Sequence, residues 1–510
     1  MFSRPWLVTC AESSVGSPSF VAEFGLWDER QTAAAEQIQA HLGEVDLVRV
    51  VYCDPHGLAR SKTLPAGVFQ MVLRNGLDFS PGPFLFDTGH AAIDPRASSE
   101  LGIDEIAGAG DFVLVPDPWT FQVLPHVEPR TAWVLGSEFL RDGSPHPLST
   151  RNVLRRVCDQ YAARDLAPVI GLEVEWYLTR LLGGSPGNEG NGFGLQGSAP
   201  DVEAVNAGYQ FNLDSFYDSV ATVTDPLASM LMALGLPLRT MEHESGPGQI
   251  ETTFSPMAAL DAADAMLFFR TLVKQACARR GFHASFMTLP RLDGFDPSGW
   301  HLHQSVVSTK TEGNVFAAEV TGEVLSPEAK AYIDGLLRRA REFCLLSVPT
   351  VNGYRRFAPR FSLAPTSANW SFEDRGVMIR VVGGGGSAHV ENRVGEPSAN
   401  PYLAIAAQLS AGLDGLAPDE SSGGHAPAAG PRAVVADSPG TPDLPTSLRE
   451  ALETFRASSH ARELLGSPLA SCLAKLKESE VSRFEAWCAR ARPPAGEVTE
   501  WEQREYFGVF

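Results

Sequence analysis

The segment Pro168-Val-Ile-Gly-Leu-Glu-Val-Glu-Trp-Tyr-Leu178 decides the fold of this chain and gives the first indication of its chemistry. Its apolar composition is typical of a β-strand. Side chains two positions apart on a strand point to the same face, so Glu173 and Glu175 share one face. Such an anionic face is costly to desolvate unless cations lie against it, and hard divalent cations prefer oxygen ligands. The segment therefore predicts a site for Mg²⁺ or Mn²⁺.

Three further clusters of polar residues follow along the chain: Glu244 with Glu251, His301-Leu302-His303, and Glu391-Asn392-Arg393. Taken singly, acidic residues that alternate on a strand are also typical of a solvated face, and alternating histidines are also typical of satisfied polar side chains. Together, the four clusters predict an active site that holds two divalent cations.

The composition bounds the class of protein. The chain has 510 residues, enough for two or more domains, and 44% of them are hydrophobic and 20% charged. No apolar run approaches the ~20 residues of a membrane helix, and the N-terminus, which we expect to be mobile, falls short of a secretory signal. The net charge of −20 argues against nucleic-acid binding, and the seven cysteines are scattered singly. We expect a cytoplasmic enzyme with reduced thiols.

The alternation of elements predicts an α+β fold with two domains, a small β-rich domain over 1–145 and a larger one over 146–510. We expect strands at 46–54, 111–116, 132–135, 168–179, 248–255, 283–289, 300–307, 376–382 and 388–394. We expect helices at 28–41, 150–164, 214–235, 257–280, 326–346, 400–413 and 447–480. Segments 184–200 and 417–446 are predicted surface excursions, and Gly383–Gly386 is a predicted hairpin rather than a phosphate loop.

With these residues in place, the chain resembles the glutamine synthetase family, the ATP-dependent ligases that join an amine to the γ-carboxylate of glutamate. The resemblance extends from about residue 44 to the end. The segments that carry it are Gly171-Leu-Glu-Val-Glu-Trp176, Glu244-Ser-Gly-Pro-Gly-Gln-Ile-Glu251, Ser298-Gly-Trp-His-Leu-His-Gln-Ser305, Asn352-Gly-Tyr-Arg-Arg356, Arg375-Gly-Val-Met-Ile-Arg380, Val390-Glu-Asn-Arg393 and Asn400-Pro-Tyr-Leu-Ala404.

The resemblance implies a β-grasp N-terminal domain and a catalytic domain with a curved antiparallel sheet flanked by helices. It also implies a homo-oligomeric ring, such as a dodecamer, with active sites between neighbouring subunits. The cation that holds the acid substrate would be bound by Glu175, Glu244 and Glu251. The cation on the nucleotide phosphates would be bound by Glu173, His301 and Glu391. Carboxylates with one imidazole suit Mg²⁺ or Mn²⁺ better than structural zinc.

The resemblance assigns further roles. His303 and Ser305 would lie near the nucleotide, and Asp87 matches the acid that a neighbouring N-terminal domain contributes. The arginines that match phosphate- and carboxylate-binding positions are Arg356, Arg375, Arg380 and Arg393; guanidinium suits this task because it contacts two oxygens and stays charged. ATP would convert the carboxylate of glutamate to an acyl phosphate, which an unprotonated amine then attacks.

The chain departs from the family pattern at three places. Leu363 stands where the family commonly carries a Glu that helps take a proton from ammonium. Asp296-Pro297 replaces an Asn-Gly pair that helps hold the amino acid substrate, and the proline removes a backbone donor. His389 replaces a common Arg two residues before Glu391. In addition, the tyrosine that is adenylylated in some bacterial members is missing from Pro397–Asn400.

Because an apolar side chain cannot bind NH₄⁺ in a dry pocket, Leu363 favours a primary amine other than ammonia as the acceptor. The product would be a γ-glutamyl amide. An apolar or aromatic amine with a low pKa fits best, with polyamines and ethanolamine left open. The alternatives are ammonia-dependent glutamine synthesis and a ring protein that has lost catalysis. Asp296 and Pro297 also leave open an acid other than glutamate.

Overall fold

The computed structural model describes residues 18–94, 108–183, 195–318, 323–417 and 442–510, and these form two compact units. The smaller unit contains residues up to Tyr52, Ser61–Phe79 and Asp111–His146, and the larger contains Cys53–Arg60, Ser80–Gly110 and Pro147–Phe510. The domain boundary between residues 145 and 146 stays a prediction. The predictions for the N-terminal residues, for 184–194 and for 418–441 fall outside the described residues.

The smaller unit is built on a mixed sheet with the strand order β2-β1-β6-β4-β3, and β5 pairs with β6. Its elements are α1 (Phe20–Phe24), α2 (Glu29–His41), β1 (Leu47–Cys53), β2 (Ala59–Pro65), α3 (Ala66–Asn75), β3 (Leu77–Phe79), β4 (Phe112–Pro116), β5 (Gln122–Val123) and β6 (Thr131–Phe139). Strands β1 and β6 are parallel neighbours, with Leu47 opposite Thr131. Helix α2 begins where predicted because Asp28 and Gln31 form a capping box.

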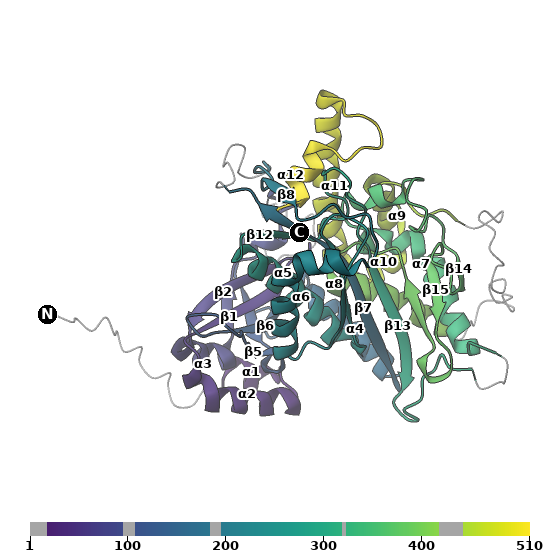
Figure 1. Ribbon diagram of the computed structural model, residues 1–510. Coiled ribbons are helices and arrows are strands. Elements are labelled where there is room, and N and C mark those ends of the chain that lie inside the picture. The colour runs from purple at the N-terminus through teal and green to yellow at the C-terminus, as the bar shows by residue number, and fades with distance from the viewer. Residues whose placement is uncertain (1–17, 95–107, 184–194, 319–322, 418–441) are drawn as a thin grey trace. The chain divides into compact units, whose positions relative to one another are not determined.

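A ten-stranded sheet with the order β14-β15-β16-β13-β7-β10-β9 forms the centre of the larger unit, and β8, β11 and β12 also pair with β7. It curls into a half-barrel flanked by helices. Its strands are β7 (Leu166–Leu181), β8 (Val202–Ala204), β9 (Leu238–His243), β10 (Gln249–Phe254), β11 (Met257–Ala258), β12 (Phe282–Ser285), β13 (Trp300–Ser308), β14 (Trp370–Phe372), β15 (Ile379–Val382) and β16 (His389–Asn392). The long strands β7 and β13 run side by side in antiparallel register (Figure 1). The predicted α+β fold with a curved antiparallel sheet is confirmed.

Strand β7 buries its apolar face completely. Ile170, Leu172, Val174 and Trp176 alternate along it, and each is 0 or 1% exposed to solvent. Burying side chains of this size stabilises the fold by about 1.5–3 kcal/mol each. The alternating residues between them, which include the two predicted acidic ligands, therefore lie on the other face of the sheet.

The helices of the larger unit are α4 (Thr150–Ala162), α5 (Asp214–Ala233), α6 (Ala259–Ala278), α7 (Pro327–Ser347), α8 (Pro401–Leu416), α9 (Leu448–Ala457), α10 (Ser459–Leu465), α11 (Ser467–Ala491) and α12 (Glu500–Tyr506). The helices predicted at 214–235, 257–280 and 326–346 are confirmed, with ends shifted by a few residues. The hairpin predicted at Gly383–Gly386 is also confirmed, because this segment joins the antiparallel strands β15 and β16.

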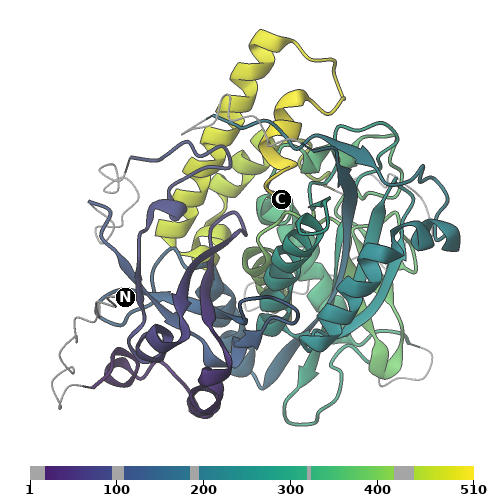
Figure 2. The same ribbon diagram turned by 60° about the vertical axis from the view of Figure 1, so that its left-hand side comes forward.

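Two predictions of elements were wrong in extent. The single helix expected over 447–480 is three helices, because Ser458 caps α10 by accepting from the amide of Ala461 and Gly466 adopts a φ of 78° before α11. Helix α11 then continues well beyond residue 480, and α12 lies beside its end, with the rings of Phe484 and Trp501 5.2 Å apart (Figure 2). The strand expected at 283–289 ends at Ser285.

The six described cysteines are free thiols, and most of them are buried. Among the described helices, none combines the length and the apolar character that a membrane crossing requires.

Helices α7 and α8 approach each other closely where both carry glycine. A Cβ atom built on Gly335 would lie 2.1 Å from the backbone oxygen of Ala411, which cannot move without shifting α8. We therefore predict that Gly335→Ala lowers the free energy of unfolding by about 1–3 kcal/mol, because the overlap outweighs the better helix propensity of alanine. Urea unfolding followed by circular dichroism measures this change. Gly386→Ala is the matched control, since nothing lies within 4 Å of its added Cβ; equal stabilities would contradict the prediction.

Candidate active site

The register of the central strands gathers the predicted ligands on one face of the sheet. His301 on β13 lies opposite Glu173 on β7, and Glu251 on β10 lies opposite Glu175. On the other side of β13, Glu391 of β16 lies opposite His303. Directly opposed residues of antiparallel strands point to the same face. Residues separated by more than two hundred positions thus become neighbours.

Two groups of three side chains are close enough for each group to hold one ion. In the first, Glu173, Glu251 and His301 offer one ligand atom each, and these atoms lie within 4.8 Å of one another. In the second, Glu173, His303 and Glu391 meet the same limit. Glu173 belongs to both, and its Oε1 lies 2.5 Å from Nδ1 of His301. These oxygen-rich sets fit Mg²⁺ or Mn²⁺.

These groups differ from the predicted sets, because Glu251 joins Glu173 and His301, while Glu175 and Glu244 belong to neither group. The Oε2 atom of Glu175 accepts from the amide of Gly299 at 3.0 Å and from Nε2 of Gln249 at 3.2 Å. Glu244 follows the end of β9 at the turn into β10 and is half-buried. The charge of Glu244 raises the pKa of Glu175, so the two carboxylates interact.

The acidic residues of this face repel one another in a poorly solvated environment. Burial raises the pKa of Glu175 to about 8 and that of Glu244 to about 7, and neighbouring carboxylates add to both shifts. Burial, followed by the charges of Glu173 and Glu175, also raises the pKa of Glu251 far above its usual range. Uncompensated negative charge of this kind is the environment that a divalent cation stabilises, so the residues fit the predicted metal.

Glu173 and Glu391 have the opposite balance. Burial alone would raise the pKa of both, but the charge and hydrogen bonds of His301 and His303 lower that of Glu173. The charges of His301 and Arg393 lower that of Glu391. These two carboxylates are therefore ionised near neutral pH, which is the form that binds a cation.

The predicted arginines surround Glu391 and His301. Nη1 of Arg393 donates to Oε1 of Glu391 at 2.5 Å, and Nη1 of Arg380 donates to Oε2 at 3.1 Å. Arg356 is 5% exposed, and its Nη2 lies 3.2 Å from Nε2 of His301. Arg375 is exposed; its backbone oxygen accepts from Nε of Arg393 at 3.1 Å, and its charge partly offsets the rise that burial causes in the pKa of Glu244. Several guanidinium groups thus stand next to the cation ligands, as phosphate chemistry requires.

Two predicted residues lie outside this cluster. Ser305 is on the same face of β13, two residues beyond His303 and opposite Val169. Asp87 is buried in the larger unit, where its Oδ2 accepts from Ser479 Oγ at 2.6 Å and from Arg483 Nε at 2.8 Å. The structure therefore places Asp87 against α11 of its own chain and not with the cation ligands. Its role at a neighbouring subunit stays a prediction.

The sequence pattern assigned no role to Gln249, which the structure places inside the site. Its Nε2 donates to Glu175 and also to Oγ of Ser298 at 3.0 Å. Gln249 precedes Glu251 by two residues on β10, so strand alternation is the signal that could have identified it. His389, which the sequence singled out as a departure from the family pattern, also reaches the site, since its Nε2 lies 3.1 Å from Nδ1 of His303.

The segments that depart from the family pattern lie around Tyr177. The hydroxyl of Tyr177 bonds to both the backbone oxygen and the amide of Asp296, at 2.7 and 2.8 Å. Phe361 packs against the cluster of Tyr177, Leu289 and Phe295. Leu363, two residues further on, is 60% exposed. The loop that carries this apolar side chain is thus anchored beside the Asp296 segment.

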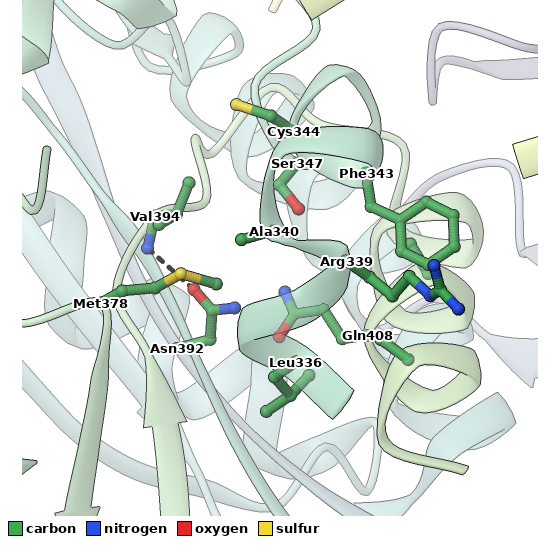
Figure 3. A pocket seen from close by; sticks show the side chains of 12 residues that line it. Leu336, Arg339, Ala340, Phe343, Cys344, Ser347, Met378, Asn392, Val394 and Gln408 are labelled. Carbon is green, nitrogen blue, oxygen red and sulfur yellow. Dashed lines mark hydrogen bonds between the residues drawn. The ribbon is translucent and has the colours of Figure 1, made fainter. Parts of the chain in front are cut away.

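A small cavity lies elsewhere, between α7, α8 and the sheet (Figure 3). Leu336, Phe343 and Met378 line it together with Gln408 and Asn392. Its volume of about 20 Å³ holds roughly one water molecule, so it cannot take a nucleotide or an amino acid. This cavity therefore does not hold the substrates.

The raised pKa of Glu175 predicts how stability depends on pH without metal. Because the folded state holds this proton up to about pH 8 and the unfolded chain releases it near 4.5, stability is lost as the pH rises between these values. With a chelator present, raising the pH from 5 to 8.5 should lower the free energy of unfolding less in Glu175→Gln than in the original protein, by at least about 1 kcal/mol. Adding Mn²⁺ should stabilise Glu175→Gln less than it stabilises the original protein. Thermal unfolding measures both; parallel pH curves would contradict the prediction.

Comparisons with known proteins agree with this geometry. A family model described as the catalytic domain of glutamine synthetase matches residues 147–506. A gamma-glutamylanilide synthase from Acinetobacter sp is 37% identical over 503 residues, covering 96% of this chain and 99% of the relative. A glutamine synthetase from Pyrococcus abyssi is 30% identical over 476 residues, covering 91% and 96%. A solved structure of GmaS with ADP is 26% identical, with a TM-score of 0.70 and coverage of 92% and 98%. The chain therefore belongs to the glutamine synthetase family of ATP-dependent ligases.

Proposed function

We propose that this protein joins glutamate to an aromatic primary amine, with ATP and Mg²⁺ or Mn²⁺, through a γ-glutamyl phosphate. The observation that carries the proposal is Leu363, an exposed apolar side chain at the position where the family commonly has an acid. A relative that shares 37% of its residues with this chain is a gamma-glutamylanilide synthase, which supports an aniline-like acceptor.

The physical reason lies in the protonation state of the amine. Ammonium and alkylamines arrive charged at neutral pH, and a dry pocket binds such a cation only beside an anion. An aromatic amine has a low pKa, so it arrives neutral and needs no strong base before it attacks. A leucine on the acceptor side offers apolar surface to the ring and no charge. Leu363 therefore favours an amine that is already neutral at the pH of the reaction.

The ligand arrangement supports the remaining parts of the proposal. Glu175, Glu244 and Glu251 would hold the cation of the acid substrate, and Glu173, His301 and Glu391 that of the nucleotide. When bound, ATP supplies the phosphoryl group that turns the γ-carboxylate into an electrophile. Arg356, Arg380 and Arg393 stand beside these ligands and would stabilise the negative charge that develops on the transferred group.

Two other functions make different predictions. Ammonia-dependent glutamine synthesis needs an acid at the acceptor position, and a non-catalytic ring protein needs no intact ligand set. Phosphate release from ATP and glutamate, measured with ammonium, alkylamines, polyamines and anilines, separates all three. The subunit number and the ring form remain predictions from the resemblance, and the cytoplasmic location remains a prediction from the composition.

Leu363→Glu should shift the preference of the enzyme from aniline toward ammonium. A carboxylate at this position would favour a charged amine and disfavour an aromatic ring, so we expect kcat/KM for aniline to fall by about tenfold or more and that for ammonium to rise. Steady-state kinetics with both amines tests this expectation. Leu363→Met is the matched control, because it keeps an apolar side chain of similar volume and should keep the aniline preference. If the ratio of kcat/KM for aniline to that for ammonium is unchanged in Leu363→Glu, Leu363 does not select the amine.

A further inference from the structure

Two imidazoles form a continuous chain of contacts that ends on a predicted cation ligand. Nδ1 of His389 lies 2.8 Å from the backbone oxygen of Ser387. Nε2 of His389 lies 3.1 Å from Nδ1 of His303. Nε2 of His303 in turn lies 3.0 Å from Oε2 of Glu173. The chain therefore runs from a backbone carbonyl through two histidines to a carboxylate.

The hydrogen atoms along this chain can be placed from one end. A carbonyl oxygen only accepts, so Nδ1 of His389 must carry its hydrogen. A neutral imidazole has one N–H group, which leaves Nε2 of His389 as an acceptor. That acceptor requires a hydrogen on Nδ1 of His303. In a neutral pair, Nε2 of His303 is consequently left with a lone pair.

This lone pair faces a carboxylate. Nε2 of His303 and Oε2 of Glu173 are 3.0 Å apart, a separation at which a charged imidazole donates to the carboxylate and a neutral pair places two lone pairs against each other. In the neutral pair, a cation in contact with both atoms removes the repulsion. Glu391 supplies a third donor, since its carboxylate, Glu173 and His303 offer ligand atoms within 4.8 Å of one another. Opposite His303 on β7 stands Gly171, where a Cβ would lie 3.2 Å from Cβ of His303, so the glycine leaves room for the imidazole.

We propose that His303 is a direct cation ligand through Nε2 and that His389 is the positioning residue that fixes its tautomer. The inference rests on the proposed use of Glu173 and Glu391 as cation ligands. It goes beyond the role that the resemblance implies for His303, which is a place near the nucleotide. With His301 on the same face, the site offers two imidazoles together with its carboxylates. A second imidazole ligand shifts the preference of the site from Mg²⁺ toward Mn²⁺.

The residue at position 389 decides the tautomer. Arginine, which the family commonly carries there, has donors only and cannot accept from Nδ1 of His303. It would instead donate to Nδ1 and leave the hydrogen on Nε2, where it would point at Glu173. With histidine at position 389, Nδ1 of His389 donates to the backbone oxygen of Ser387, so Nε2 of His389 accepts from Nδ1 of His303. The exchange from arginine to histidine thus turns a nitrogen lone pair toward the cation position.

Metal binding to the full-length protein tests the proposal without substrates. Mn²⁺ is titrated and the free ion is followed by electron paramagnetic resonance, with Mg²⁺ measured by competition. The modulation of the bound Mn²⁺ signal by ¹⁴N reports coordinated imidazoles. We expect couplings from two imidazoles in the original protein and from one in His303→Gln. In His389→Arg we expect the Mn²⁺ affinity to fall by about tenfold, and the Mg²⁺ affinity to change much less.

His389→Gln is the conservative variant, because its side-chain oxygen can still accept from Nδ1 of His303, and it should keep most of the Mn²⁺ preference. His41→Gln, on the exposed surface of α2, is the control for loss of a histidine and should change nothing. Coupling to a single imidazole in the original protein would overturn the ligand role of His303. An unchanged Mn²⁺ to Mg²⁺ ratio in His389→Arg would overturn the positioning role. Since no amine is present, neither result depends on the proposed acceptor.

Discussion

Repulsion among carboxylates that share one face of a sheet is the constraint on which the rest of this structure depends. Glu173, Glu175 and Glu251 stand on adjacent strands, and burial makes their ionisation costly. The opposite face of β7 is packed with apolar side chains, so the strand cannot rotate to expose the acids without losing its core. The fold therefore holds negative charge together that would otherwise separate, and cations are the partners that offset it.

The protein's own polar side chains compensate these acids unevenly. Arg380 and Arg393 both contact Glu391, while the imidazoles of His301 and His303 contact Glu173. The pKa values of these two acids are therefore lowered, whereas those of Glu175 and Glu251 are raised. Glu173 and Glu391 are therefore ionised near neutral pH without a metal. Glu175 and Glu251 hold protons there, and a bound cation would stabilise their ionised form. The two proposed cation positions, one with Glu175, Glu244 and Glu251 and the other with Glu173, His301 and Glu391, would thus differ in electrostatics.

The sequence could predict which residues share a face within one strand, because alternation at Glu173 and Glu175 or at His301 and His303 needs no partner. It could not predict that Glu391 lies opposite His303, since the register between distant strands depends on the whole sheet. Gln249 was missed as a donor to Glu175, although its place two residues before Glu251 on β10 puts it on the same face. The extents of the C-terminal helices were wrong because single capping residues, Ser458 and Gly466, outweighed a continuous apolar pattern.

The departures from the family pattern lie on two types of element, loops and a strand. Leu363, Asp296 and Pro297 are in loops, which can change without disturbing the sheet that holds the cations. A new acceptor can therefore be accommodated while phosphoryl chemistry is kept. His389 is different, because it is the first residue of β16 and lies two positions before Glu391. A change on a strand would alter the ligands themselves, so under the proposed function the cation and the amine are selected by separate parts of the fold.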